Sequence, residues 1–298
     1  MNAVKHNIKG SWVRGSLIIL VILSFISIAP VLLMVISSVT EEGSLLEDGY
    51  SFFPKQLSLD SYRALFAQQT SIAQAYQNSA LVTVLGITIH LSLTMLFAYP
   101  LSRSNFKFRR FFSFIVFFTM LFNGGVVPSY ILWTRYLGVR NTFWALLLPN
   151  YLMSAFNVIL CKNYLKHNIP DALTEAAEID GAKEITVFLR IVVPLSVPIL
   201  STIGLLAGIT YWNDWTNGLY YITTKKLYSI QQLLVMILNN IQFLSSGNSY
   251  MTGGYTFVFP SVSYRMAIAV VGLLPVLICM PFLQKYLVRG MVIGAIKE

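Results

Sequence analysis

The 298-residue chain is strongly apolar: 56% of its residues are hydrophobic and only 11% are charged. Soluble domains carry charge on about 25% of their residues, so this composition excludes an ordinary soluble domain and indicates a chain surrounded largely by lipid. The formal net charge is +9. An excess of basic residues can indicate either nucleic-acid binding or membrane topology, and their placement along the chain decides between the two.

Six apolar runs are long enough to cross a bilayer as helices, because about 30 Å of hydrocarbon requires roughly 20 residues at about 1.5 Å each. In chain order they are Leu17–Val39, Ala80–Leu101, Phe111–Trp133, Phe143–Cys161, Pro198–Trp215 and Met266–Phe282. The first run could also be a cleaved signal sequence, but it is longer than the usual apolar signal core and no small-x-small cleavage site follows it. We interpret it as a retained anchor. The sequence therefore predicts an all-α integral membrane protein whose six transmembrane helices occupy residues 17–284.

The basic residues are unevenly distributed between alternate loops. If residues 1–16 are cytoplasmic, the inner segments hold most of the 21 Lys and Arg residues. This is the distribution that the positive-inside rule describes. It predicts that residues 1–16 and the tail 285–298 are both cytoplasmic, that segments 40–79 and 216–265 are external, and that the chain does not bind nucleic acid.

The inner segment 170–194 carries a strong local pattern. Pro170 suits the first position of a short amphipathic helix, and Asp171 complements the positive end of its dipole. Gly181 supplies a left-handed stop. A second helix with apolar residues at helical spacing then runs to Pro194. On amphipathicity alone, this helix pair could equally be an element that lies on the membrane surface.

The spacing within this segment resembles the EAA loop of bacterial ABC-importer permeases, whose pattern is E-A-A-x3-G-x9-I-x-L-P. Val193 replaces the usual Leu. The resemblance implies a type I ABC-importer permease fold in which this loop docks on an ATP-binding subunit and transmits its closure to the membrane helices. The residues expected to couple the chain to the ATPase are Glu175, Ala176, Ala177, Asp180, Gly181, Ile191 and Pro194.

Other stretches extend this resemblance over nearly the whole chain. Four stretches resemble maltose-type carbohydrate permeases, particularly the branch that takes up aldouronate and other complex oligosaccharides: residues 122–130, Leu137-Gly138, residues 141–145 and Trp212–Asp214. The C-terminal residues resemble the Gly-containing tail of that family. This resemblance implies that Gly290 and Gly294 belong to a tail that reaches toward the ATP-binding subunits.

Polar residues at membrane depth are candidate substrate contacts, because each is costly there without a partner or a water-filled cavity. Asp214 is the sharpest case: with its two preceding neighbours it could form a corner that stacks on a sugar and binds hydroxyls, or it could cap a helix end. Asn123 and the glycines after it could break a helix that lines a cavity, although helix packing explains the glycines equally well. The candidates are Asn123, Tyr130, Asn157, Trp212, Asn213 and Asp214.

Two other functions compete with an ABC permease. A secondary transporter usually needs several acids or histidines inside the membrane, and only His90 and Asp214 qualify. An integral membrane enzyme is not indicated, because no G-x-S-x-G or H-E-x-x-H motif is present and the three scattered histidines suggest no metal site. The chain also lacks a G-x-x-x-x-G-K-[ST] phosphate loop, so ATP and Mg²⁺ are expected on partner subunits.

The resemblance implies a complete assembly. It predicts a permease subunit, itself not an enzyme and without a cofactor, in the bacterial cytoplasmic membrane. Its expected partners are a second homologous permease chain, two ATP-binding subunits and an extracellular solute-binding protein. The expected cargo is a carbohydrate, in particular an oligosaccharide, and the branch resemblance suggests an acidic one.

Overall fold

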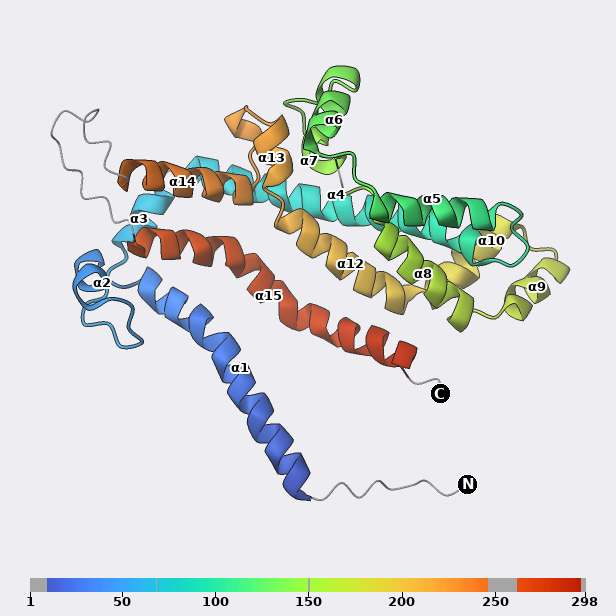
Figure 1. Cartoon of the computed structure of the whole chain (residues 1–298), viewed down its shortest axis with the longest axis horizontal. Coiled ribbons are helices and arrows are strands. Elements are labelled where there is room, and N and C mark those ends of the chain that lie inside the picture. The colour runs from blue at the N-terminus through green and yellow to red at the C-terminus, as the bar shows by residue number, and fades with distance from the viewer. Residues whose placement is uncertain (1–9, 68, 150, 246–261, 296–298) are drawn as a thin grey trace. The chain divides into compact units, whose positions relative to one another are not determined.

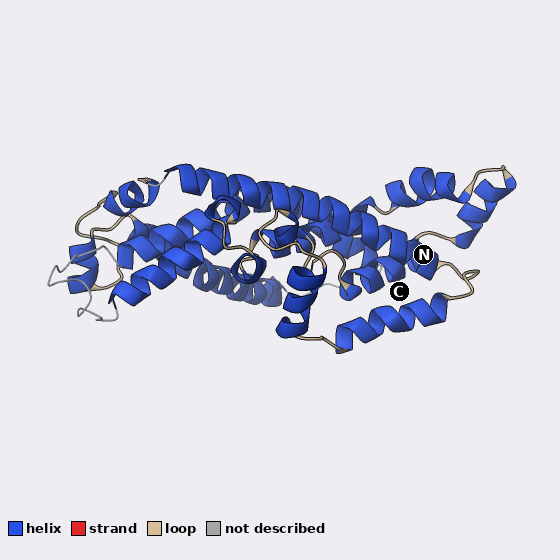
Figure 2. Cartoon of the chain, turned by 90° about the horizontal axis from the view of Figure 1, so that it is seen from above, coloured by secondary structure: helices blue, strands red, loops and turns tan. Residues whose placement is uncertain are grey.

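The computed structural model describes residues 10–67, 69–149, 151–245 and 262–295. Over these residues the chain consists of helices and loops (Figures 1 and 2), and the one β contact there is an isolated antiparallel bridge between Thr40 and Leu57. The all-α prediction is therefore confirmed for the described part. Part of the predicted external segment, residues 246–261, lies outside the described residues, as do residues 1–9 and 296–298.

The chain divides into two compact units, Met1–Gln69 with Leu238–Leu273, and Thr70–Ile237 with Leu274–Glu298. Two helices continue from one unit into the other, α14 (Ile230–Ser245) and α15 (Val262–Ala295). The first unit also contains α1 (Gly10–Ser38), α2 (Glu42–Asp48) and α3 (Asp60–Phe66). The second contains α4 (Gln69–Ser102), α5 (Arg109–Leu121), α6 (Val126–Ile131), η1 (Leu132–Tyr136), α7 (Trp144–Leu147), α8 (Ala155–Asn168), α9 (Asp171–Ile179), α10 (Glu184–Val187), η2 (Phe188–Val192), α11 (Val193–Leu195), α12 (Val197–Trp212), α13 (Thr216–Tyr221) and η3 (Lys225–Leu227).

In the first unit, α1 presents apolar side chains on all sides. From Leu17 to Ile28 every large hydrophobic side chain is more than half exposed. A helix that is apolar all round is found in a hydrophobic core or in a bilayer, and soluble proteins rarely expose so large an apolar surface to water. The side chains of α1 therefore suit lipid contact.

Side chains from α2 and α3 hold the start of α15. The Glu42 carboxylate accepts hydrogen bonds from the backbone N–H groups of Val262 and Ser263, both at 2.9 Å. The hydroxyls of Ser61 and Ser263 lie 2.7 Å apart in a buried hydrogen bond. The first N–H groups of a helix have no partner within it, so a carboxylate there satisfies them and complements the helix dipole. Parts of the predicted external segment 40–79 thus form ordered helices tied to the sixth predicted span.

Three helices are long and apolar enough to cross a membrane individually. They are Gly15–Ser38 within α1, Ile72–Ser102 within α4 and Val262–Cys279 within α15. Two bent pairs would each make a further crossing: Arg109–Leu121 with Val126–Tyr136, bent by 111°, and Glu184–Leu195 with Val197–Trp212, bent by 76°. The described residues therefore contain three to five candidate spans, and the predicted count of six helices is not reproduced.

The fourth predicted span, Phe143–Cys161, is not a continuous helix. It is divided into α7, an irregular stretch and α8. Pro149 follows α7, and proline both lacks an N–H group and disfavours helix in the residue before it. The carbonyls of Pro149 and Tyr151 accept hydrogen bonds from the side chains of Asn217 and His90, at 3.0 and 2.8 Å. Polar side chains from other helices therefore satisfy the broken backbone, as buried carbonyl groups require.

The third predicted span is broken, which is one of the two explanations that the sequence left open for Asn123 and the glycines after it. α5 ends at Leu121, and the chain resumes helix at Val126 after the 111° bend. Gly125 has a φ of +86°, a left-handed value that glycine adopts without steric cost. The Asn123 Oδ1 atom accepts the Gly125 N–H at 2.9 Å. Asparagine and glycine therefore form the local turn that ends α5.

Two hydrophobic clusters form the core of the second unit. Figure 1 shows α5 and α8 running beside each other, and both contribute to the first cluster together with α4, η2 and α12. The buried members of the first cluster are Met95, Ala98, Tyr99, Leu101, Val116, Val158, Cys161, Leu165, Ile169, Val187, Phe188, Val192, Ile199 and Ile203. Those of the second are Val82, Ala145, Leu146, Leu147, Tyr211, Tyr221, Ile222 and Tyr228.

Gly86 of α4 packs directly against the Tyr211 ring of α12. A Cβ atom at position 86 would lie 2.5–2.7 Å from three atoms of that ring. The ring is buried, and its hydroxyl donates to the Leu147 carbonyl at 3.3 Å, so it has little freedom to move away. Overpacking of this kind costs about 1–3 kcal/mol. Gly86→Ala should therefore lower the melting temperature of the detergent-solubilised protein by several degrees.

The matched control is Gly204→Ala in α12. There a new Cβ atom would meet its nearest neighbour, a Leu91 methyl carbon, at an ordinary 3.4 Å. Alanine forms helix better than glycine by about 1 kcal/mol, so this substitution should leave the melting temperature unchanged or raise it. Equal melting temperatures for the two variants would contradict close packing at Gly86.

Candidate functional site

The coupling segment, residues 170–194, consists of α9, a turn at Gly181, and the bent helical stretch α10–η2–α11. Asp171 lies in the first turn of α9 as expected, whereas Pro170 precedes the helix and does not occupy its first position. Gly181 has a φ of +83°. The left-handed stop predicted at this glycine is therefore confirmed.

The coupling segment has some side chains that pack against the rest of the second unit and others that are exposed. Thr174 is buried, and Ala177 and Ile191 are half-buried and pack against the first hydrophobic cluster. Ile179, at the end of α9, is 86% exposed, although isoleucine is among the residues most often buried. Five of the residues expected to couple the chain to the ATPase are also exposed: Glu175, Ala176, Asp180, Gly181 and Pro194. These exposed side chains are partly apolar.

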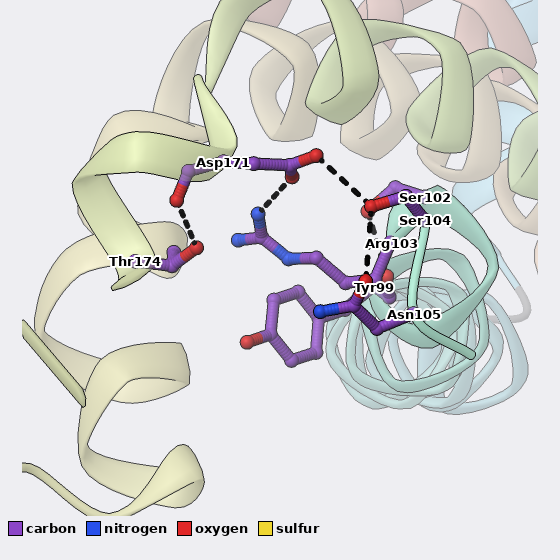
Figure 3. A network of polar contacts seen from close by, with 7 residues as sticks. All are labelled: Tyr99, Ser102, Arg103, Ser104, Asn105, Asp171 and Thr174. Atoms are coloured by element: carbon purple, nitrogen blue, oxygen red, sulfur yellow. Dashed lines mark hydrogen bonds and ion pairs between the residues drawn. The ribbon is translucent and has the colours of Figure 1, made fainter. Parts of the chain in front are cut away.

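An ion pair joins the end of α4 to the start of α9 (Figure 3). Arg103 donates from Nη1 to Asp171 Oδ1 at 2.8 Å, and the Ser104 hydroxyl donates to Asp171 Oδ2 at 3.3 Å. The guanidinium lies over the Tyr99 ring, 5.0 Å from its centroid. The Arg103 side chain is only 16% exposed, while that of Asp171 is 50% exposed. Because one partner is shielded from water, this pair stabilises the contact more than a typical surface ion pair does.

Tyr99 links α4 to the second half of the coupling segment. Its ring packs on Phe188 of η2 with 5.1 Å between the ring centroids, and both residues are buried. A cavity of about 220 Å³ lies beside this contact. Its lining includes Arg103 and four carboxylates, those of Asp171, Glu175, Glu178 and Glu184. The end of α4 therefore contacts both helices of the coupling segment.

No sequence motif distinguishes Arg103 or Tyr99 from other residues near the ends of spans. In the sequence, Arg103 is one of several basic residues in a predicted inner segment. It lies 68 positions before Asp171. No local spacing rule relates residues so far apart, because helix packing brings them together. The sole signal in the sequence was a basic residue at the cytoplasmic end of a predicted span.

A second group of polar side chains surrounds the break between α7 and α8. His90 of α4 donates from Nδ1 to the Tyr151 carbonyl at 2.8 Å, and the Asn157 amide nitrogen donates to His90 Nε2 at 2.9 Å. The Tyr151 carbonyl can only accept, so the Nδ1 atom of His90 carries the proton of this bond. Both side chains are buried, and the hydrogen bonds offset their desolvation.

Asp214 is buried and holds the start of α13. Its Oδ1 atom accepts hydrogen bonds from the Thr216 N–H and hydroxyl at 3.0 and 2.8 Å, and from the Asn217 N–H at 3.2 Å. The Tyr151 hydroxyl also donates to it, at 3.2 Å. This is the helix-cap arrangement that the sequence left open as the alternative to a sugar-binding corner. Tyr151 therefore connects Asp214 to the His90 group.

A cavity of about 460 Å³ opens beside the His90 group. Its volume lies within the range of about 300–1,000 Å³ that is usual for small-molecule sites. The Tyr151 and Tyr211 rings lie edge to face there, with 5.7 Å between their centroids. The cavity is lined by His90, Tyr151, Ser154, Phe156, Asn157, Leu206, Ala207, Ile209, Thr210 and Tyr211. Asn157 is the predicted substrate residue that the structure brings to this cavity.

The two residues before Asp214, Trp212 and Asn213, do not take part in the hydrogen bonds of the Asp214 carboxylate. Asn213 is exposed, and its amide donates to the Ile209 carbonyl of its own helix at 3.0 Å. The Trp212 ring lies near the Tyr76 ring, with 6.1 Å between their centroids. The three residues 212–214 are therefore adjacent in the chain but contact different surroundings.

The remaining predicted residues also lie away from this cavity. Tyr130 stacks on Tyr221 with 5.9 Å between ring centroids. Asn123 forms the turn before α6. Gly290 and Gly294 lie in the last turns of α15.

Comparisons with known proteins agree over almost the whole chain. A family model described as "Binding-protein-dependent transport system inner membrane component" matches residues 90–293. Protein LplC of Bacillus subtilis (strain 168) is 36% identical over 275 residues, which cover 91% of this chain and 90% of LplC. The polygalacturonan/rhamnogalacturonan transport system permease protein YtcP of the same organism is 34% identical over 278 residues, 93% of this chain and 95% of YtcP. A crystal structure of a bacterial ABC transporter involved in the import of the acidic polysaccharide alginate contains a similar chain, with a TM-score of 0.77 and 26% identity over 96% of this chain and 99% of that one.

The family match includes both groups of residues described above. It begins at His90 and extends through the coupling segment into α15. The apolar helices of the chain agree with a multi-pass membrane protein. Because the matched region exceeds half of the chain, the chain belongs to the family of inner membrane components of binding-protein-dependent transport systems.

Proposed function

We propose that the chain is the permease subunit of an ATP-driven importer of oligosaccharides. The observation that carries this proposal is the similarity, over 96% of the chain, to a subunit of the alginate-importing transporter. YtcP, a relative over 93% of the chain, is named for polygalacturonan and rhamnogalacturonan transport. Alginate and polygalacturonan are both acidic polysaccharides, so these names favour an oligosaccharide with uronic acids as the substrate of this chain.

The proposed assembly contains this chain, a second homologous permease, two ATP-binding subunits and an extracellular solute-binding protein. ATP and Mg²⁺ bind to the ATP-binding subunits. The chain crosses the bacterial cytoplasmic membrane six times with both termini in the cytoplasm. The fourth crossing consists of α7, the irregular stretch after it and the part of α8 that ends at Cys161. The basic residues of the inner segments support this orientation.

The helices that contact the coupling segment also line the 460 Å³ cavity, so movement of this segment would displace the cavity wall. Closure of the ATP-binding subunits would push on the exposed side of α9. α9 is bound to the end of α4 through Asp171 and Arg103, and the stretch α10–η2–α11 continues into α12. α4 and α12 also carry His90 and Tyr211, which line the 460 Å³ cavity. The two helices that hold the coupling segment are therefore the helices whose displacement would reshape the cavity.

The cavity lining suits part of a sugar chain. Aromatic rings pack on the apolar faces of sugars, and amide and hydroxyl groups exchange hydrogen bonds with their hydroxyls. Tyr151, Tyr211 and Phe156 supply the rings, and Phe156 is 53% exposed. Among the described residues, no group donates to the Oδ1 atom of Asn157, so this atom is free to accept from a hydroxyl. We propose a second contact at the outer end of α12, where Trp212 and the exposed Asn213 lie.

The function is tested by purifying the chain with its partners. The chain is tagged in its native membrane and extracted gently, and ATP hydrolysis by the recovered complex is measured with candidate oligosaccharides and solute-binding protein. Recovery of a second permease and an ATP-binding subunit, with hydrolysis stimulated by sugar, is the expected result. Recovery of a chain that transports a solute alone, without ATP, would instead favour a secondary transporter that uses His90 and Asp214 as coupling groups.

Replacing Asn157 with alanine should raise the oligosaccharide concentration for half-maximal transport about three- to tenfold, because a neutral hydrogen bond contributes about 0.5–1.5 kcal/mol. Transport is measured in proteoliposomes that contain the complex. Asn168→Ala, in the same helix, is the control: its amide donates to the Tyr164 carbonyl at 3.0 Å, and it does not line the cavity. A lower maximal rate with unchanged half-saturation would mean that Asn157 only supports His90.

A further inference from the structure

A cavity of about 810 Å³ lies at the start of α5 and shares Ser104, Asn105 and Phe106 with the 220 Å³ cavity beside the coupling segment. It contains four cationic side chains, and none of the residues that line it is acidic. The lining residues are Ser104, Asn105, Phe106, Lys107, Arg109, Arg110, Ser113 and Lys162. We refer to this cavity as the basic cavity.

The cations of the basic cavity have no anionic partner within the described part of the chain. The three ion pairs found there involve Lys55, Arg63 and Arg103 instead. Lys162 donates from Nζ to the neutral Ser113 hydroxyl at 3.0 Å. Four positive charges around one cavity repel each other, so they favour an anion in the space between them.

The helix start at this cavity adds to the positive potential. α5 begins at Arg109, has no acidic residue in its first turn and receives no hydrogen bond from a capping side chain. The N-terminus of a helix carries free N–H groups and a partial positive charge, so cations such as Arg109 and Arg110 are unfavourable there. An anion at the same place would accept from the N–H groups and offset the repulsion.

The positive charges around the basic cavity disfavour the charged form of Lys162. It follows the fourth predicted span and is half-buried. Burial lowers the pKa of its ammonium group, and the like charges of Arg109 and Lys166 lower it further. A bound anion would reverse this effect, because a nearby negative charge favours the charged ammonium.

A row of exposed aromatic rings continues from the basic cavity along α5. Phe111, Phe114, Phe118 and Phe122 are 45–64% exposed. The rings of Phe114, Phe118 and Phe122 follow one another along the helix, with 6.1 and 4.4 Å between successive centroids. A charged cavity next to such an apolar surface matches the two parts of a phospholipid, and basic pockets between membrane helices on the cytoplasmic side bind anionic headgroups.

We propose that the basic cavity binds a phosphate group, either in the headgroup of an anionic phospholipid or as free phosphate. Its oxygens accept charge-assisted hydrogen bonds from the side chains of Lys107, Arg109, Arg110 and Lys162. The Ser113 hydroxyl and N–H groups in the first turn of α5 also donate to it, except the Arg109 N–H, which donates to the Phe106 carbonyl. The phenylalanine row favours the lipid, whose acyl chains would lie along α5. Neutralisation of the cations would stabilise the junction of α4, α5 and α8.

The test uses the complex purified with its partner subunits, and it measures melting temperature against concentration of three probes. These are short-chain phosphatidylglycerol, short-chain phosphatidylcholine, and inorganic phosphate compared with chloride at equal ionic strength. Stabilisation by phosphatidylglycerol alone identifies a lipid headgroup, and equal stabilisation by inorganic phosphate identifies free phosphate. Either outcome supports the proposal, whereas no stabilisation beyond phosphatidylcholine and chloride overturns it.

Two double variants test whether the probes bind at the basic cavity. Arg109→Gln/Lys162→Gln should raise the half-saturating probe concentration by about tenfold or more, since each lost charge-assisted hydrogen bond weakens binding by about this factor. Lys225→Gln/Lys226→Gln removes the same charge from exposed lysines of η3 and should leave binding unchanged. If the first variant does not fold, the exposed Arg110 is replaced alone, and Arg110→Gln should weaken binding severalfold.

Two results would show that the cations serve another purpose. One is a response to phosphatidylglycerol in Arg109→Gln/Lys162→Gln that equals the wild-type response. The other is a loss of the ATP-binding subunit from the purified variant complex while the response to phosphate probes stays unchanged, which would assign the basic cavity to an acidic protein surface. Both overturn the phosphate site.

Discussion

Replacing Arg103 with alanine should lower transport by about five- to thirtyfold while ATP hydrolysis by the complex continues. The guanidinium joins α4 to α9 through Asp171 and lies over the Tyr99 ring. A charge-assisted hydrogen bond with one shielded partner contributes about 1–2 kcal/mol, which corresponds to this factor in the population of the docked helix. Without it, α9 would move with the ATP-binding subunit but would no longer pull on α4.

The measurement compares transport and ATP hydrolysis in the same proteoliposomes, and hydrogen exchange of residues 171–179 reports whether α9 has loosened. Arg190→Ala is the matched control, because Arg190 lies in the same coupling segment with an exposed side chain. Asp171→Ala should resemble Arg103→Ala, and the double variant should lose little more than either single variant. Additive losses, or an Arg103→Ala variant that couples as well as Arg190→Ala, would exclude the ion pair as the mechanical link.

Replacing Gly181 with valine should lower the ratio of transport to ATP hydrolysis by about tenfold. The residue has a φ of +83°, which costs an L-residue roughly 1–2 kcal/mol and is especially unfavourable for a β-branched side chain. Beyond its two chain neighbours, no heavy atom lies within 4 Å of the position that a Cβ atom would take. The cost therefore comes from backbone conformation and not from a clash within the chain, and the turn between α9 and α10 should shift to relieve it.

Gly181→Asn separates backbone strain from lost space. Asparagine tolerates left-handed φ values better than other non-glycine residues, so this variant should retain most of the coupling that Gly181→Val loses. The ratio of transported oligosaccharide to hydrolysed ATP is measured for both. If both variants lose coupling equally, a partner subunit must occupy the open space beside Gly181. If neither does, the left-handed turn is not needed for transport.

The coupling segment shows what local sequence can determine. The E-A-A spacing, the acidic first turn of α9 and the stop at Gly181 were predictable because each depends on neighbours within one or two helical turns. The turn at Asn123–Gly125 is of the same kind. By contrast, the break after α7 was missed, because apolar residues on both sides of Pro149 gave the run Phe143–Cys161 the composition of one continuous span.

The sequence by itself thus determined that the chain is helical, that it belongs in a membrane and where its E-A-A pattern lies. Apolar run length, charge placement and short-range spacing encode these properties directly. Only the tertiary structure showed that Arg103 holds Asp171, that His90 joins Tyr151 to Asn157, and that α4 and α12 carry both the coupling segment and the cavity. These partners are 61–68 residues apart, and such pairs are chosen by how helices pack, because each buried polar group must find a partner wherever the fold places one.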